Sequence, residues 1–180
     1  MVLEAEHIYQ QDGSVGIRHQ GFDGIVVTSG DSYLFSVFTK QLSKEPVSLK
    51  ISLQTRKGDV LAEQKLTVSS MNWEKQTAVL TSSVSYDTAS LVIALVSKGK
   101  TALDVVSLFP EKTFRNRSNG MRADLAQLLA DMKPAFIRFP GGCLVHGDGL
   151  GNMYRWKNTI GPLEQRVEQR NIWGYHQTGG

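Results

Sequence analysis

Cysteine is almost absent from this chain of 180 residues, which contains Cys143 alone. A single cysteine excludes an internal disulfide, and without nearby histidines or further cysteines it does not make a metal site. We therefore expect no metal and no organic cofactor. Cysteine content fits a reducing compartment, but exported bacterial enzymes also lack disulfides, so it does not identify the localisation.

The chain also lacks a large excess of charge of either sign and any long hydrophobic run. The chain has 20 basic and 17 acidic residues, and the basic ones are dispersed, which argues against a nucleic-acid partner. The longest apolar run, Leu91 to Val96, has the length of a strand and is far too short to span a membrane. The N-terminus, MVLEAEHIYQ, lacks the charged and apolar regions of a signal peptide. Hydrophobic residues make up 41% of the chain, which is enough for a sizeable core.

What is present, up to about residue 110, is a pattern of short strands and turns. Val47, Leu49, Ile51 and Leu53 alternate with polar residues, which predicts a strand with one buried and one wet face. Turns are predicted at 29–31 and 57–59, and a hairpin connection at 98–100. Further strands are predicted at 24–28, 33–39, 60–68, 77–82, 90–97 and 102–109. Seven or eight strands at this spacing predict a mainly β fold, a β-sandwich of jelly-roll type.

The pattern changes after Pro110. Apolar residues at helical spacing, from Met121 to Met132, predict a helix that Ser118 or Asn119 would cap and Pro134 would end. A short buried strand is predicted at 135–139 (AFIRF), followed by a glycine-rich turn and a long loop from 144 to 180. A helix, a buried strand and a glycine-rich loop in succession are typical of an α/β protein.

Several sequence motifs in this second part are similar to those of a known protein family. They are RFPGG at 138–142, YRWKNTIGP at 154–162 and WGYH at 173–176, with DVVSLFPEKTF at 104–114 as the link to the sandwich. Together they resemble the α-L-arabinofuranosidases of glycoside hydrolase family fifty-one. The resemblance implies a (β/α)8 barrel that releases terminal arabinofuranosyl groups from arabinose-containing polysaccharides with retention of configuration. A complete barrel needs about 250 residues, so we expect residues 1–112 to form a carbohydrate-binding-like sandwich and residues 113–180 an incomplete N-terminal portion of the barrel.

The same resemblance bears on catalysis. A retaining glycosidase needs two carboxyl groups about 5–5.5 Å apart, and in this family both are glutamates on later barrel strands. No carboxylate after Pro110 matches either motif. We therefore expect no catalytic residue in this chain, and no activity from the chain alone.

Five residues are candidates for substrate binding by resemblance: Arg138, Gly141, Gly142, Cys143 and Trp173. A guanidinium can donate to sugar hydroxyls, glycines allow close backbone approach, and an indole can stack on a sugar ring. Each has a plainer alternative: a structural ion pair for the arginine, a tight turn for the glycines, a small buried hydrophobe for the cysteine and packing for the tryptophan.

Two other functions stay open. The sandwich could be a free-standing carbohydrate-binding module, with Trp73 and Tyr86 as the stacking candidates, or a non-catalytic scaffold. A barrel fragment predicts exposed apolar side chains beyond Phe114 and proteolytic cleavage near 112–120. The resemblance would also allow a homo-oligomer and an extracellular or periplasmic location for the full-length enzyme, but the chain specifies neither.

Overall fold

The computed structural model describes residues 1–7, 15–117 and 120–177. The chain divides into two compact units, Met1–Leu128 and Leu129–Gly180, which are described separately below. Ser118 and Asn119, the residues expected to cap the helix, lie outside the described residues. No helix in the described part is long and apolar enough to cross a membrane.

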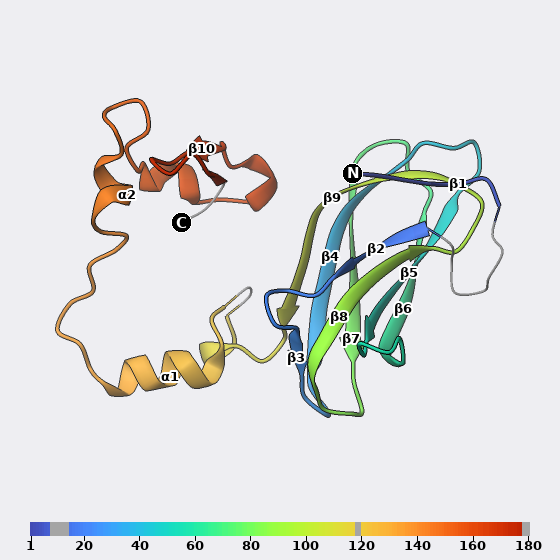
Figure 1. Cartoon of the computed structure of the whole chain (residues 1–180), viewed down its shortest axis with the longest axis horizontal. Helices are drawn as coiled ribbons and strands as arrows, with labels where there is room; N and C mark the ends of the chain where they lie inside the picture. Colours follow the sequence, from blue (N-terminus) through green and yellow to red (C-terminus); the bar gives the residue numbers. More distant parts are fainter. Residues whose placement is uncertain (8–14, 118–119, 178–180) are drawn as a thin grey trace. The chain divides into compact units, whose positions relative to one another are not determined.

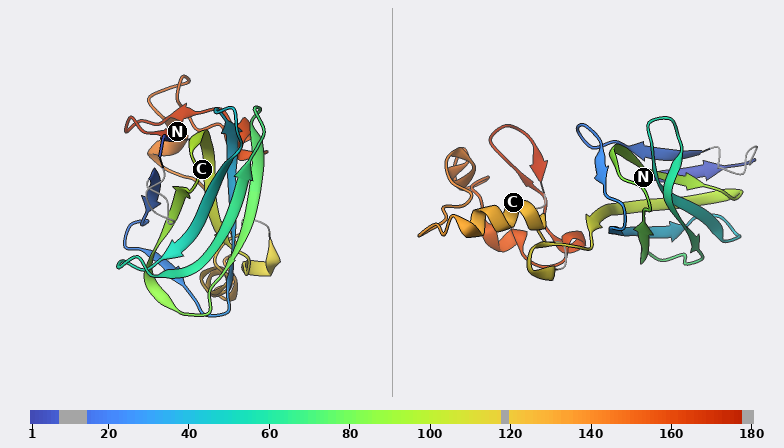
Figure 2. Two further views of the ribbon diagram at one scale, coloured as in Figure 1. Left: turned by 90° about the vertical axis from the view of Figure 1, so that its right-hand side faces the viewer. Right: turned by 90° about the horizontal axis from the view of Figure 1, so that it is seen from below.

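The first unit is a sandwich of two antiparallel sheets (Figure 1). One sheet has the order β1 (Val2–Ala5), β9 (Gly99–Pro110), β4 (Ser32–Gln41) and β7 (Glu74–Thr81). The other has the order β2 (Val15–His19), β8 (Tyr86–Leu95), β5 (Val47–Gln54) and β6 (Val60–Val68), with β3 (Ile25–Val27) also paired to β8. The two layers can be followed in the turned views of Figure 2.

The order of strands is that of a jelly roll. The chain crosses from one sheet to the other at every connection in the described sandwich except β2–β3 and the β5–β6 hairpin. The hairpin turns at Gly58, whose positive φ of 97° favours glycine. The predicted mainly β fold with a jelly-roll sandwich is therefore confirmed.

The hairpin predicted at Lys98–Lys100 is wrong, because β8 and β9 belong to different sheets. Gly99 instead lets the chain pass between the layers. Its φ is 134°, and a methyl group on its Cα would lie 2.5 Å from Cγ1 of Val47. The sequence suggested a local turn at a position where the fold requires a close crossing.

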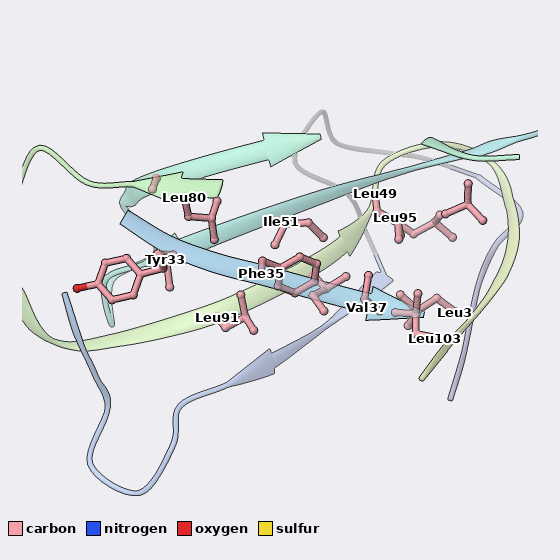
Figure 3. Close-up of a cluster of buried hydrophobic side chains, with 14 of the residues drawn as sticks. Leu3, Tyr33, Phe35, Val37, Leu49, Ile51, Leu80, Leu91, Leu95 and Leu103 are labelled. Atoms are coloured by element: carbon pink, nitrogen blue, oxygen red, sulfur yellow. The ribbon is translucent and has the colours of Figure 1, made fainter. Parts of the chain in front are cut away.

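The core lies between the two sheets (Figure 3). Val47, Leu49, Ile51 and Leu53 of β5 are fully buried, as their alternation predicted. Phe35 of the opposite sheet is equally buried and lies in the same cluster. Full burial of such side chains is worth about 1.5–3 kcal/mol each, so the sandwich holds most of the chain's hydrophobic stabilisation.

The polar face of β5, which the alternation predicted to be exposed to solvent, is largely covered, because Lys50 and Ser52 are also buried. Long polar side chains of the same sheet lie over this face, one from β2 and one from β5 itself. Arg18 Nη2 donates to Gln54 Oε1 at 2.7 Å, and Gln54 Nε2 donates to Ser52 Oγ at 2.9 Å. A central strand is therefore sheltered on both faces even where its residues alternate in polarity.

The second part of the chain contains short elements. After η1 (Phe114–Asn116), helix α1 (Ala123–Asp131) forms where the apolar spacing predicted a helix. The remaining elements are α2 (Cys143–His146), η2 (Trp156–Thr159), η3 (Leu163–Gln165), β10 (Gln169–Arg170) and β11 (His176–Gln177). The last two pair as an antiparallel ribbon inside the expected long loop.

The buried strand predicted at 135–139 is not formed. The segment belongs to no sheet, and Phe136 and Ile137 are 83% and 82% exposed. A strand needs hydrogen-bonded neighbours to satisfy its backbone, and no described strand pairs with this segment. The apolar sequence is present without the sheet that would bury it.

Candidate functional site

Arg138 and Gly141 lie against each other at the turn that follows α1. The Arg138 side chain is exposed, and a methyl group on Gly141 would lie 3.5 Å from its Nε atom. Gly141 has a φ of 75°, so its backbone adopts a conformation that favours glycine. Within residues 1–7, 15–117 and 120–177 nothing occupies the guanidinium, so it can donate to a ligand placed beside this turn.

Gly142 leads directly into the one-turn helix α2, whose first residue is Cys143. Gly142 has a φ of 60° and a ψ of −147°, which again favours glycine. Cys143 is exposed, so the alternative of a small buried hydrophobe is wrong in this structure. Its carbonyl accepts the N–H of Gly147 at 3.0 Å, which ends the helix.

The turn and α2 are tied to the following loop. The rings of Phe139 and Tyr154 meet edge to face with centroids 6.3 Å apart, and Tyr154 N donates to Val145 O at 3.1 Å. His146 donates from Nδ1 to the carbonyl of Gly147 at 2.5 Å. These local contacts hold α2 in place although the apolar residues around it are exposed.

A polar hollow of about 520 Å³ lies in the same unit, lined by residues of 148–152 and 170–172. Asn152 organises it: its Oδ1 accepts the N–H of Asp148 at 2.7 Å, and its Nδ2 donates to Asp148 Oδ2 at 3.1 Å. Arg170 also lines the hollow. Sequence reasoning missed this cluster, although the run GDGLGN (147–152) could have pointed to it.

Trp173 lies at the tip of the β10–β11 ribbon, and its side chain is 58% exposed. The buried Asn171 shapes this tip, because its Oδ1 accepts the N–H groups of Trp173 and Tyr175 at 3.0 Å each. The structure thus brings Arg138, Gly141, Gly142 and Cys143 together along one turn. Trp173 belongs to a separate turn, and none of the five predicted residues lines the polar hollow.

Three of the carboxylates described after Pro110, Asp124, Asp148 and Glu168, have polar partners close in the chain. Asp148 is bonded to Asn152, and Glu168 meets His176 at 2.7 Å. The Arg122 guanidinium, bonded to both oxygens of Asp124, lowers the pKa of that carboxyl to about 2, with help from the Leu125 N–H. In the described ranges no three His, Cys, Asp or Glu side chains gather in a way that could hold a metal ion.

Known proteins resemble this chain, and one family profile matches the part that follows the sandwich. The profile of the Alpha-L-arabinofuranosidase 1 domain family matches residues 128–180. An extracellular exo-alpha-L-arabinofuranosidase of Streptomyces chartreusis is 36% identical over 176 residues, which cover 91% of this chain and 21% of that protein. Alpha-L-arabinofuranosidase 1 of Arabidopsis thaliana is 35% identical over 173 residues, covering 93% of this chain and 25% of that protein.

A solved structure is similar to this chain over the same extent as these two relatives. The arabinose-bound MgGH51 α-L-arabinofuranosidase has a TM-score of 0.81 and 33% identity, covering 91% of this chain and 28% of that chain. The chain therefore spans between a fifth and just over a quarter of the length of these relatives. The similarity extends through the sandwich as well as the segment after it, and the chain belongs to the α-L-arabinofuranosidase family of glycoside hydrolases, family fifty-one.

Proposed function

We propose that this chain is the part of a retaining α-L-arabinofuranosidase that supplies an accessory sandwich and one wall of the arabinose-binding subsite. The substrate is an arabinose-containing polysaccharide or oligosaccharide from which terminal arabinofuranosyl residues are released. The functional boundary falls between residues 112 and 113, just beyond the end of β9 at Pro110.

One observation carries the proposal: the segment after the sandwich exposes the apolar side chains that a barrel would bury. Leu125, Leu128, Leu129 and Met132 form the apolar stripe of α1 and its C-terminal end, and all are more than half exposed. Phe136, Ile137 and Phe139 are at least 70% exposed. Soluble proteins rarely leave so many neighbouring apolar residues uncovered. This is the exposure beyond Phe114 that the sequence predicts for a barrel fragment.

The candidate subsite is the turn of Arg138, Gly141, Gly142 and Cys143. An exposed guanidinium beside a glycine turn can donate to sugar hydroxyls while the backbone approaches the ring closely. The match of the Alpha-L-arabinofuranosidase 1 domain to 128–180 supports this assignment, since it includes the whole turn and Trp173. The exposed indole of Trp173 completes the proposal as a stacking surface.

The chain alone lacks the catalytic pair in this proposal. Asp148 and Glu168 are engaged with an amide and an imidazole, and Asp124 is held ionised by Arg122. A general acid needs a raised pKa, so Asp124 with its lowered pKa is unsuited to that role.

Hydrolysis of 4-nitrophenyl α-L-arabinofuranoside tests the proposal. The 180-residue chain and a longer protein that completes the barrel are assayed side by side. We expect cleavage by the longer protein only, and a loss of about 100-fold in kcat/KM when its Arg138 is replaced by Ala, because a charged hydrogen bond to the transition state is worth a few kcal/mol. Activity in the 180-residue chain would contradict the absence of the catalytic pair.

Trp73 favours a second function for the sandwich, that of a carbohydrate-binding module, because its ring is 47% exposed on the β6–β7 connection. Retardation of the chain by arabinan or arabinoxylan in a native gel tests this reading. Binding that is lost on Trp73→Ala would establish it, and migration unchanged by either polysaccharide would exclude it.

A further inference from the structure

The β10–β11 ribbon (Figure 1) turns through residues 171–175, and Trp173 is the central residue of this tip. Asn171 N donates to Tyr175 O at 2.9 Å, and Gly174 N donates to Asn171 O at 3.0 Å. The second bond closes a four-residue turn in which Asn171 is first, Trp173 third and Gly174 fourth. Type I turns, the commonest kind, favour asparagine at the first position and glycine at the fourth. The local sequence therefore specifies this turn and places the tryptophan in it.

The side chain of Asn171 fixes the backbone of the same turn a second time. Asn171 is only 9% exposed, and its Oδ1 accepts the N–H groups of Trp173 and Tyr175 at 3.0 Å each. A carboxamide oxygen has two lone pairs, so one atom serves both donors. The backbone of Trp173 is thus bonded to a buried side chain, whereas its own indole is exposed. An apolar residue at position 171 would leave both N–H groups without this acceptor.

The root of the ribbon is fixed as well. Gln169 Nε2 donates to Met153 O, which ties β10 to the loop that follows α2. At the same end, His176 Nδ1 lies 2.7 Å from Glu168 Oε1. The tip is therefore bonded internally and stands on a ribbon that is held at its base. A side chain whose backbone is fixed before binding loses less conformational freedom when a ligand arrives.

We propose that Asn171 is a positioning residue of the arabinose subsite, which holds Trp173 in place for stacking on the sugar ring. Asn171 acts through the backbone of Trp173 and need not touch the sugar. The inference rests on the proposed function, in which the exposed indole is the stacking surface. It adds a requirement outside the motif WGYH: residue 171 must carry a side-chain acceptor at this distance from the backbone, which asparagine and aspartate share.

Two replacements of similar volume separate the acceptor from the bulk of the side chain. Asn171→Asp keeps the Oδ1 oxygen, whereas Asn171→Leu removes it. Both are made in the longer protein that completes the barrel and are assayed on 4-nitrophenyl α-L-arabinofuranoside. We expect Asn171→Leu to raise KM about 10-fold, as the loss of two ordinary hydrogen bonds would, and Asn171→Asp to raise it less than about 3-fold. The effect falls on KM because stacking holds the sugar in the ground state as well as in the transition state.

Trp173→Ala, alone and combined with Asn171→Leu, shows whether the effect passes through the indole. We expect Trp173→Ala to raise KM, and Asn171→Leu to raise it no further in that background. A general loss of folded enzyme would instead lower the apparent kcat in both backgrounds and leave KM unchanged, which would overturn the inference. Thermal unfolding of each variant measures that loss.

Three further results would decide against the inference. An unchanged KM in Asn171→Leu, or the same rise with and without Trp173, would mean that Asn171 does not act through the indole. A rise in Asn171→Asp equal to that in Asn171→Leu would mean that the acceptor is not what matters. These outcomes leave the proposed function standing, whereas an unchanged KM in Trp173→Ala would remove the stacking role itself and this inference with it. The role of Arg138 is tested separately by its own replacement.

Discussion

The sandwich and the segment after it both contain many apolar residues, but only the sandwich buries them. In the sandwich, apolar residues on facing strands meet in one core, and twelve large side chains are less than 2% exposed. In residues 129–177, no described hydrophobic side chain is buried, although the segment contains Phe136, Ile137, Trp156 and Trp173. The difference teaches that apolar content stabilises a fold only where other apolar side chains are present to bury it.

The comparison is sharpest at a pair of phenylalanines. Phe35→Ala removes a ring that is 1% exposed and should cost about 3–5 kcal/mol of unfolding free energy. Phe136→Ala removes a ring that is 83% exposed, so the unfolding free energy should change by less than about 0.5 kcal/mol. Urea denaturation followed by tryptophan fluorescence or circular dichroism measures both. Equal losses would mean that the second segment has a core of its own.

A pair of glycines makes the same comparison at the backbone. A methyl group on Gly24 would lie 2.3 Å from the Cα of Thr88, so Gly24→Ala forces two strands apart and should cost about 2 kcal/mol or more. Gly142 also has a positive φ, but a methyl group there meets nothing within 4 Å. Gly142→Ala should therefore cost only local strain, about 1 kcal/mol, and leave the melting temperature of the sandwich unchanged. Thermal unfolding of the two variants checks the difference.

Limited proteolysis should cleave the chain between the sandwich, which has a buried core, and the segment after it, which leaves its apolar side chains exposed. We expect trypsin to cut first between residues 112 and 120, at Lys112, Arg115 or Arg117, and to leave a stable sandwich. The second segment should be degraded further. Mass spectrometry of the time course identifies the fragments, and a first cut inside β4 to β9 would contradict the autonomy of the sandwich.

The smallest effect is expected at the Arg122–Asp124 pair at the start of α1. The Asp124 pKa of about 2 is below its ordinary value, so the pair contributes stability above about pH 4 that is lost as the pH falls towards 2. Arg122→Gln should return the Asp124 pKa towards its ordinary value. Carboxyl titration by NMR measures this, with Glu111 as the internal control. An unchanged Asp124 pKa in the variant would assign the shift to the backbone N–H groups instead.

Local sequence patterns predicted those elements whose partners are near in the chain or whose faces differ strongly. The strand β5 followed from alternation, the turn after it from the residues at 57–59, and α1 from apolar spacing. The short edge strands β1 and β2 were missed, because four or five residues carry little pattern and depend on distant partners for pairing. The failures at Gly99 and at 135–139 have the same origin: strand pairing is a long-range property that neither segment encodes alone.

The candidate site was predicted only in part for a related reason. Arg138, Gly141, Gly142 and Cys143 are adjacent in sequence, so a motif captured them together. The polar hollow joins Asp148 and Asn152 to Arg170, and this association depends on how the loop folds back. A motif read along the chain does not reveal such a cluster.

Hydrogen exchange of the intact 180-residue chain, resolved by residue, tests the central claim most directly. The account predicts amides of β4, β5, β8 and β9 that exchange only on global unfolding, and amides of 129–177 that exchange within seconds to minutes. Addition of the remaining barrel in a longer protein should then slow exchange in 129–177 while leaving the sandwich unchanged. Equal protection of the two regions in the 180-residue chain would contradict the claim that the second segment lacks the partners that bury it.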